Sequence, residues 1–466
     1  MSSIPQVSEA MQRVLTTRAK QLERPTGFVQ RSSAQLDGPT FAQTTVFGWM
    51  ANPQASYPQL RHVAASVDVA VSAQAIEQRF GKESAALLRE LLQEAVGEVL
   101  CSQASVPELL SRFSGVYVQD GTLISLPAEL KDDWPGWGGS TPEAGASSLR
   151  VQVRLDLARG GMQGPWLSAG REAERSGQAH EAPLPEGCLY NVDAGYFTLS
   201  EMRAHSKAGR YWLTSAKAGT LLVDARGQCW DLISFLRAQK SDEVDVELFL
   251  GKRERLPVRL IAKRVSPELA KQRRASANRL VEGKPKGVQR PNAKKRQPGD
   301  KRQRQRKHRR TGKKRLELLE WTILVTNVPR ALLSLEEALV LARCRWQIEL
   351  CWKLWKQVGK VDTWRSAKPY RILSEIYAKL LGLLITHWLT LIECWPAPNR
   401  SLFKARQVVQ WMAPVLALGV AGVVPLASMV GRTAHTMASG CTVTARRKRP
   451  AAYQLVANPK LIRGLG

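Results

Sequence analysis

The chain has 466 residues, with 69 lysines and arginines against 40 aspartates and glutamates, and therefore a formal net charge of +29. This length exceeds one ordinary hydrophobic core, so we expect two to four domains. The excess of positive charge predicts a polyanionic partner, either nucleic acid or an anionic membrane. Seven cysteines without a CxxC pair argue against a disulfide scaffold and a zinc site, and favour a reducing cytosol.

Residues 1–112 are predicted to be helical. The segment 60–80 has the pattern of a helix, a short turn and a second helix that Ser72 would cap. Four polar side chains of the second helix are expected to face outward, namely Gln74, Glu77, Gln78 and Arg79. Such a pair is similar to a helix-turn-helix that reads the major groove, and it fits an ordinary helical hairpin equally well.

Residues 113–209 predict a mixed sheet with acids at the strand ends. Asp120 stands with Gly121 at an interruption of the first strand, and Asp193 follows the apolar run of the last one. A helix is expected from Thr198. The second strand alternates apolar and polar residues, as a half-buried strand does. The four strands are expected at 115–127, 148–158, 164–170 and 187–197.

Residues 210–318 contain further strand patterns and end in a basic tract. From Lys271 to Arg315 there are 20 lysines and arginines and two acids, a composition that cannot bury enough apolar surface to fold alone. One interpretation is a solvated loop. We favour contact with phosphates, because such a density of charge gains from counterion release. The strands of this region are expected at 210–216, 220–225, 242–251 and 256–265.

Order is predicted again after the basic tract. Segment 316–329 has the apolar run of a buried strand. Residues 334–357 are predicted to form one long helix, with Ser334 and Glu337 as its capping box.

Helices are expected from 370 to 430, and a basic cluster follows near the C-terminus. The uncharged stretch 408–430 is long enough to span a bilayer, but Pro414 and Pro425 interrupt it. We therefore expect a buried helix and turn there, a core helix at 375–395, and no membrane partner.

One acid lies among cations and tryptophans in the segment RCRWQIELCWKLWK, residues 343–356. Helical spacing puts Arg345, Glu349, Trp352 and Lys356 on one face. Glu349 has a structural interpretation as the ion-pair partner of its neighbours Arg345 or Lys353. The functional interpretation is that the cations bind a ligand and that Glu349 also acts on this ligand.

Asp120, Asp193 and Glu349 together form a set of three carboxylates. Such a set can hold two Mg²⁺ ions that clamp the oxygens of a phosphoryl displacement. Singly, Asp120 could belong to a turn and Asp193 could cap a helix. In a chain this basic, the metal site is the better interpretation of the three acids together.

Three blocks of the sequence resemble bacterial insertion-sequence transposases of the DDE type. The subgroup has a ribonuclease-H-like core, a β-rich insertion before the glutamate, and a Tyr-Arg-Glu-Lys signature. The resemblance covers about residues 25 to 455, and WTILVTNVP (321–329) and RRKRP (446–450) are similar as well. The three blocks are Asp120-Gly-Thr122, Asn191-Val-Asp193-Ala-Gly-Tyr196 and Arg345-x₃-Glu349-x₆-Lys356.

The resemblance implies an α/β fold: a ribonuclease-H-like mixed sheet flanked by helices, interrupted by a β-rich insertion, with helical N- and C-terminal regions. It implies five segments along the chain. These are a helical DNA-end-binding domain (1–112), the first part of the catalytic core (113–209), the insertion ending in the basic tract (210–318), the second part of the core (319–369), and a C-terminal helical region with a basic tail (370–466).

The resemblance also implies roles for single residues. Asp120, Asp193 and Glu349 would ligate two Mg²⁺ ions, for which Mn²⁺ could substitute. Trp321 would stack on a base flipped out near the transposon end, although a core tryptophan is an equal alternative. The residues expected to contact DNA are Arg345, Lys356, Trp321, Arg343 and Lys353.

The implied activity is cut-and-paste transposition. Water would attack the phosphodiester at the element's end, and the freed 3′-hydroxyl would attack the opposite strand to form a hairpin, and later the target DNA. The implied partners are terminal inverted repeats, target DNA and a second copy in the synaptic complex, in the cytoplasm of a bacterium at its nucleoid. Two alternatives stay open: a nuclease on the same fold, and a catalytically impaired DNA-binding relic, because Ala342 stands where the signature has tyrosine.

Overall fold

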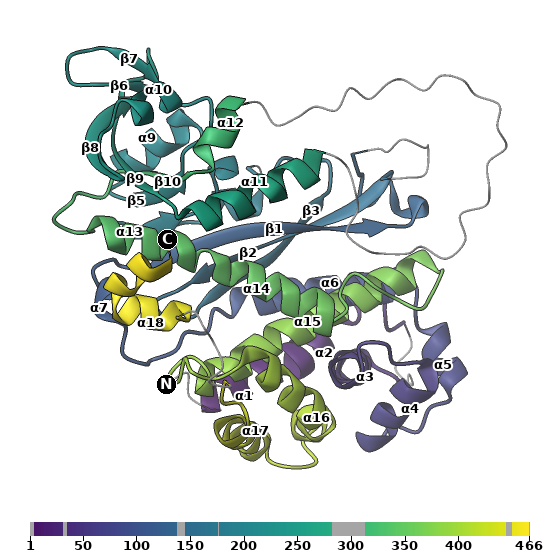
Figure 1. Cartoon of the computed structure of the whole chain (residues 1–466). Coiled ribbons are helices and arrows are strands. Elements are labelled where there is room, and N and C mark those ends of the chain that lie inside the picture. Colours follow the sequence, from purple (N-terminus) through teal and green to yellow (C-terminus); the bar gives the residue numbers. More distant parts are fainter. Residues whose placement is uncertain are drawn as a thin grey trace, which may run out of the picture. The chain divides into compact units, whose positions relative to one another are not determined.

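The computed structural model describes residues 4–30, 35–137, 145–175, 177–281, 313–443 and 450–465. They form two compact units, each built from separate stretches of the chain, and Figure 1 shows their elements. The first unit contains Met1–Val192 and Cys344–Ala457, and the second contains Asp193–Arg343 and Asn458–Gly466.

Four strands of the first unit lie in the order β3-β2-β1-β4. β1 pairs antiparallel with β2 and parallel with β4, and β2 pairs antiparallel with β3. This mixed pairing, together with helices, is an α/β arrangement. The strands are β1 (Val116–Leu126), β2 (Ser147–Asp156), β3 (Met162–Ala169) and β4 (Leu189–Asn191).

β1 is not interrupted at Asp120-Gly121, contrary to the sequence prediction. Its pairing with β2 continues through Asp120, which lies opposite Val153, and Gly121, which lies opposite Gln152. The long partner strand holds the glycine in the ladder, so Asp120 is a mid-strand residue.

β2 is buried on both faces, whereas its alternating pattern predicted a half-buried strand. Three of its polar side chains, those of Arg150, Gln152 and Arg154, find hydrogen-bond partners in the residues that follow β3 (170–175 and 177–184). Arg150 binds the carboxylate of Glu174 at 2.8 Å, and Gln152 donates to the carbonyl of the same residue. Arg154 donates to the Ala179 carbonyl at 2.8 Å. Polar residues can be buried where most of their donors find partners of this kind, and a simple alternation does not reveal these partners.

Helices make up the rest of the first unit. The N-terminal ones are α1 (Ile4–Gln12), a π-helical segment (Arg13–Arg18), α2 (Ala19–Leu22), α3 (Gly38–Ala51), α4 (Tyr57–Ser66), α5 (Ala73–Gln78), α6 (Lys82–Gly97) and α7 (Glu108–Ser111). Two short ones follow, Ala128–Leu130 and α8 (Gln178–Glu181). The C-terminal ones are α14 (Trp346–Lys353), a π-helical segment (Leu354–Val358), α15 (Pro369–Glu393), α16 (Leu402–Val420), α17 (Leu426–Gly440) and α18 (Ala452–Ala457).

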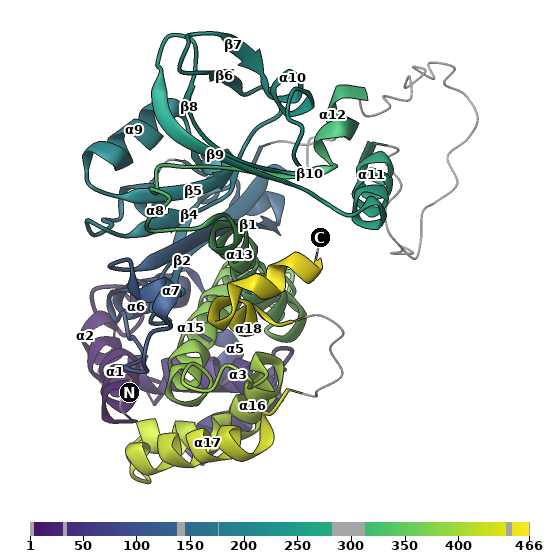
Figure 2. The same ribbon diagram turned by 60° about the vertical axis from the view of Figure 1, so that its left-hand side comes forward.

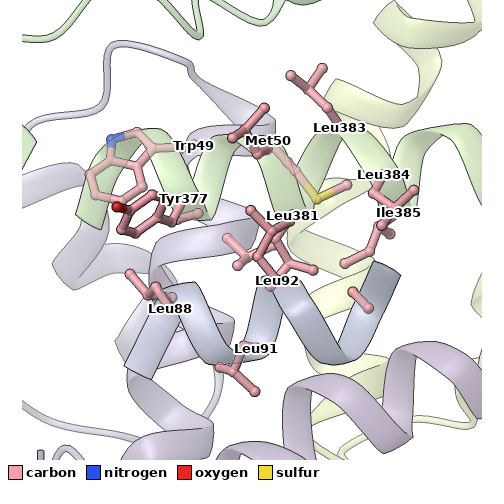
Figure 3. Packing of buried hydrophobic residues seen from close by; sticks show 14 of the residues in the cluster. Trp49, Met50, Leu88, Leu91, Leu92, Tyr377, Leu381, Leu383, Leu384 and Ile385 are labelled. Carbon is pink, nitrogen blue, oxygen red and sulfur yellow. The ribbon is translucent and has the colours of Figure 1, made fainter. Parts of the chain in front are cut away.

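α15 is the central helix of this unit. It packs against α3, α6, α16 and α17, and Figure 3 shows its apolar side chains interleaved with those of α3 and α6. Among the described residues, α15 is the helix long and apolar enough to cross a membrane, but 94% of its apolar window is buried inside the protein. It is therefore a core helix, as predicted for 375–395. The N-terminal and C-terminal helices share one core, so residues 1–112 alone would expose apolar surface.

The helix pair predicted at 60–80 is present as α4 and α5. Ser72 caps α5 by accepting a hydrogen bond from the Ala75 backbone N–H, and Gln74 and Gln78 are exposed, as expected. Arg79 does not face outward. Its guanidinium lies 3.9 Å from the centre of the Phe28 ring and donates from Nη2 to the Phe28 and Leu36 carbonyls, contacts that hold it against the fold.

Six strands of the second unit lie in the order β5-β10-β9-β8-β6-β7, and each neighbouring pair among them is antiparallel (Figure 2). They are β5 (Tyr211–Ser215), β6 (Leu221–Val223), β7 (Cys229–Asp231), β8 (Glu243–Leu250), β9 (Leu256–Arg264) and β10 (Trp321–Thr326). The helices are Ala194–Tyr196, α9 (Leu199–Lys207), α10 (Leu232–Arg237), α11 (Pro267–Val281), α12 (Lys313–Leu318), α13 (Leu335–Cys344) and Pro459–Leu465. β7, α10 and α11 were not predicted. α11 includes residues 271–281, the start of the basic tract that was predicted not to fold alone, and the tract from 282 to 312 lies outside the described residues.

The single helix predicted at 334–357 is divided. Its capping box is present: the Ser334 N–H donates to Glu337 at 2.8 Å, and the Glu337 N–H donates back. α13 ends at Cys344, and α14 begins at Trp346. At the junction the Ile348 N–H donates to the Arg345 carbonyl, an i→i−3 bond that tightens the turn, and the segment after α14 is π-helical.

Candidate active site

Asp120 on β1 and Glu349 on α14 belong to the first unit, in which these two elements pack against each other (Figure 1). Asp120 lies opposite Val153, so it points to the sheet face that carries Val118 and Ile124. That face shares its core with Ile348, Trp352 and Trp355 from the helical segment that bears Glu349.

Asp120 is half-buried, and its surroundings pull its pKa in opposite directions. Burial raises the pKa above the ordinary range of aspartate and is the largest effect. The Gly121 N–H, the charge of Arg345 and the Trp352 indole N–H each lower the pKa, and the charge of Glu174 raises it. Trp352 Nε1 is buried without a partner that meets hydrogen-bond geometry, so its effect on Asp120 is the weakest of these.

Two cations lie beside the two acids. The Arg345 guanidinium forms a long ion pair of 3.5 Å with Glu349, one helical turn away, and both side chains are partly exposed. The Lys356 ammonium donates to the Leu123 carbonyl on β1 at 3.4 Å. Both contacts are longer than strong charge-assisted bonds, so a closer anion could replace them at little cost.

The first expected outcome concerns Asp120→Asn, measured by thermal unfolding in EDTA. Because the folded chain holds the pKa of Asp120 above its unfolded value, ionisation favours the unfolded state once the pH exceeds that pKa. We therefore expect the variant to have a higher Tm than the wild type at neutral pH. The difference should shrink as the pH falls through the folded pKa, because the wild-type carboxyl is then neutral. A lower Tm at neutral pH would mean that the carboxylate is held by favourable partners.

The other predicted site residues lie in different places. Asp193 is exposed and precedes the short helix Ala194–Tyr196, and it is the first residue of the second unit. Arg343, near the end of α13, and Lys353, at the end of α14, are both exposed. Trp321 opens β10 and is 7% exposed, with the Arg264 guanidinium 4.8 Å from its ring centre.

Trp346 was not singled out from the sequence. It follows Arg345 directly and is 50% exposed, with the Lys353 ammonium 5.6 Å from its ring centre. An exposed aromatic ring beside cations is a surface on which nucleic-acid bases stack. The sequence shows that Trp346 follows the signature arginine. It does not show which of the three tryptophans in the segment is exposed.

The donor atoms suit hard divalent cations, which prefer carboxylate oxygens. Asp120 adds a carboxylate whose charge is disfavoured by burial, a cost that a bound cation would offset. Within the described ranges no cluster of three or more histidine, cysteine, aspartate or glutamate side chains is assembled for a metal ion. The structure thus brings two of the three proposed ligands into one unit.

Carboxylates and cations on two packed elements of an α/β chain of charge +29 are features of an enzyme that cleaves nucleic acid. Residues 112–385, more than half of the chain, match the family described as "Transposase DDE domain". The chain belongs to this family of DDE transposases, enzymes that cleave DNA and transfer its strands with divalent metal ions.

Curated relatives agree with this assignment. The chain is 24% identical over 425 residues to the transposase for insertion sequence element IS231F of Bacillus thuringiensis subsp. israelensis, covering 86% of this chain and 80% of the relative. It is 24% identical over 403 residues to that of IS231B from B. thuringiensis subsp. berliner, covering 81% and 78%. The transposase of IS1151 from Clostridium perfringens is 22% identical over 355 residues, covering 70% and 69%.

Proposed function

We propose that this transposase binds the terminal inverted repeats of its own insertion sequence, cleaves the DNA there through a hairpin, and joins the element to target DNA. The observation that carries the site is the placement of Glu349 on α14 against the strand that bears Asp120, with Arg345 and Lys356 beside them. Acids and phosphate-binding cations on one helix face suit phosphoryl transfer, which needs charge stabilisation and alignment.

Asp120, Asp193 and Glu349 are the residues that we assign to two Mg²⁺ ions, with Mn²⁺ as a substitute. Bound ions would stabilise charge on the phosphate oxygens. Support for Asp193 comes from the strand that precedes it. β4 runs parallel to β1, with Leu189 paired to Val116, and it ends at Asn191, two residues before Asp193.

Arg345 and Lys356 are the residues that we assign to the phosphates beside the cleaved bond, with Arg343 and Lys353 as outer contacts. Lys356 has its ammonium on a strand carbonyl at 3.4 Å, a contact that a phosphate oxygen can replace. Ala342 offers no donor where the family signature has tyrosine, so these cations carry the phosphate contact alone.

Trp321 is assigned to stacking on a base near the transposon end, as the family resemblance implies. Arg264 covers its ring and also pairs with Asp242 at 2.9 Å. A base can reach the ring only if the Arg264 guanidinium swings away.

The family implies a ribonuclease-H-like core, to which we assign β1–β4 and β10, with β5–β9 as the β-rich insertion. α4 and α5 are proposed to read the element's end through Gln74 and Gln78, which are exposed. Two copies are proposed to assemble on the two ends for synapsis, the usual closed arrangement of identical subunits.

The test of this proposal is nicking of labelled duplexes by the full chain. A duplex with the element's inverted repeat should be nicked in Mg²⁺ or Mn²⁺ and left intact in EDTA. A duplex of the same composition with the repeat scrambled should be nicked far less. Equal nicking of both duplexes would indicate a nuclease without end recognition, and binding without nicking in either metal would indicate a catalytically impaired relic.

A further inference from the structure

Three charged side chains are buried on one face of α15, in the core of the first unit. Arg371, Glu375 and Lys379 are spaced one helical turn apart, and their side chains are 4%, 2% and 1% exposed. Glu375 lies between the two cations, with oxygen atoms 3.3 Å from Arg371 and 2.7 Å from Lys379. The family chemistry uses none of these residues, and a buried charge needs a reason.

Lys379 is hydrogen-bonded to the backbone at the end of the helical segment that carries Glu349 and Lys356. Its ammonium donates to the carbonyls of Lys360 and Thr363, at 3.1 and 2.8 Å, in addition to its bond with Glu375. All three donors of the ammonium are therefore used. The two carbonyls belong to the turn that directly follows the π-helical segment carrying Lys356.

We call this turn, residues 359–363, the exit turn. Its surroundings hold it in a conformation that is unfavourable for an isolated chain. Lys360 has a φ of 50°, in the left-handed region that a non-glycine residue keeps only when its surroundings enforce it. A Cβ on Gly359 would lie 2.7 Å from the Trp355 carbonyl and 2.8 Å from a Leu383 methyl group on α15. The segment is thus seated directly against α15, and Lys379 closes its end.

Arg371 makes the corresponding contact with the N-terminal helices. Its guanidinium lies 4.1 Å from the ring centre of Phe80, 4.4 Å from that of Trp49 and 5.0 Å from that of Tyr57. Two surface contacts join the same parts of the chain. The Arg365 guanidinium donates to the Gln54 carbonyl, and Lys368 pairs with Glu77 on α5 at 3.0 Å.

We propose that Lys379 is a positioning residue for DNA cleavage. By holding the exit turn, it fixes the register of the helical segment that carries Glu349 and Lys356. Lys379 pairs with Glu375, and Glu375 pairs with Arg371, which packs against the N-terminal region proposed to read the element's end. The position of the helical segment is therefore coupled to that region. The inference rests on the proposed function of those residues. An apolar side chain would fill the same volume without the desolvation cost of a buried charge. What the Lys379 ammonium provides beyond packing is its pair of hydrogen bonds to the Lys360 and Thr363 carbonyls.

The variant that tests this is Lys379→Met. Methionine has a similar length and shape, and the remaining Arg371–Glu375 pair stays balanced in charge. We expect affinity for the end duplex to stay within about twofold, while single-turnover nicking slows by about ten- to hundredfold, because a small displacement of reacting groups acts on the transition state alone. Lys379→Gln keeps N–H donors for the carbonyls and should recover part of the rate.

Ser374→Ala is the matched control on the same helix. It removes the buried hydroxyl contact of 3.0 Å between Ser374 and Ser84, which joins α15 to α6 and lies away from the exit turn. Urea unfolding should show lower stability for this variant, with an unchanged nicking rate.

Nicking by Lys379→Met at the wild-type rate would overturn the inference. The inference would also fail if the slower nicking of Lys379→Met were fully explained by a smaller fraction of folded or DNA-bound protein. It would fail as well if Ser374→Ala slowed nicking by the same factor. A wild-type chain that does not nick in metal would instead contradict the proposed function, and the two failures are therefore separate.

Discussion

Replacing any one of Asp120, Asp193 or Glu349 by alanine is expected to lower metal-dependent nicking of the element's end by at least about a hundred- to thousandfold. Loss of one preorganised electrostatic group commonly costs a factor of this size, and loss of a metal ligand removes more than one such interaction. The measurement is single-turnover nicking of a pre-bound labelled duplex in Mg²⁺ and in Mn²⁺. Binding of the duplex in EDTA should change little, because it depends on cations elsewhere.

Glu108→Ala is the control for loss of an acid, since this side chain is 89% exposed and pairs with Arg112, the residue that follows α7. It should nick at the wild-type rate. The decisive variant is Asp193→Ala, because Asp120 and Glu349 are joined by the packing of α14 on β1, whereas Asp193 rests on strand register and resemblance. Near-normal nicking by Asp193→Ala would remove it from the metal site while leaving the other two.

Deletion of Lys284–Arg310 is expected to weaken binding to every duplex and to flatten its dependence on salt. This stretch has thirteen lysines and arginines and one aspartate. A protein that neutralises about 6–10 phosphates loses about 10³- to 10⁵-fold in affinity between about 50 and 200 mM salt. The variant should lose much less over the same range, as measured by equilibrium binding at several salt concentrations.

Two replacements separate charge from sequence in this tract. A glycine-serine stretch of equal length should behave like the deletion, and a shuffled order of the native residues should restore the wild-type salt slope. An unchanged slope in the glycine-serine variant would show that the tract does not contact DNA.

The strand and helix positions were largely predictable, because apolar alternation and capping residues act locally. β2, β5, β8, β9 and α9 all lie where the pattern predicts them. Two errors have a common cause. The Asp120-Gly121 dipeptide was interpreted as an interruption, and β2 as half-buried, since neither the partner strand nor the hydrogen-bond partners that follow β3 are visible in a local window.

The candidate site was predictable only in part. Spacing on a helix placed Arg345, Glu349 and Lys356 on one face; in the structure Arg345 pairs with Glu349, and Lys356 contacts the Leu123 carbonyl on β1. The hydrogen bonds from Lys379 to the exit turn were not predictable, because their acceptors are backbone carbonyls and not side chains. Side-chain identity carries no information about which backbone carbonyl an ammonium will meet.

The shared core of the first unit also has a consequence for synthesis of the chain. α3 and α6 bury their apolar faces against α15, which the ribosome makes only after about 270 further residues. At about 5–20 residues per second, that interval is on the order of tens of seconds. During this time the faces of α3 and α6 that pack against α15 lack that partner, although both helices also contact other N-terminal helices. Apolar surface that stays exposed in this way makes a partly synthesised chain prone to aggregation until α15 closes the core.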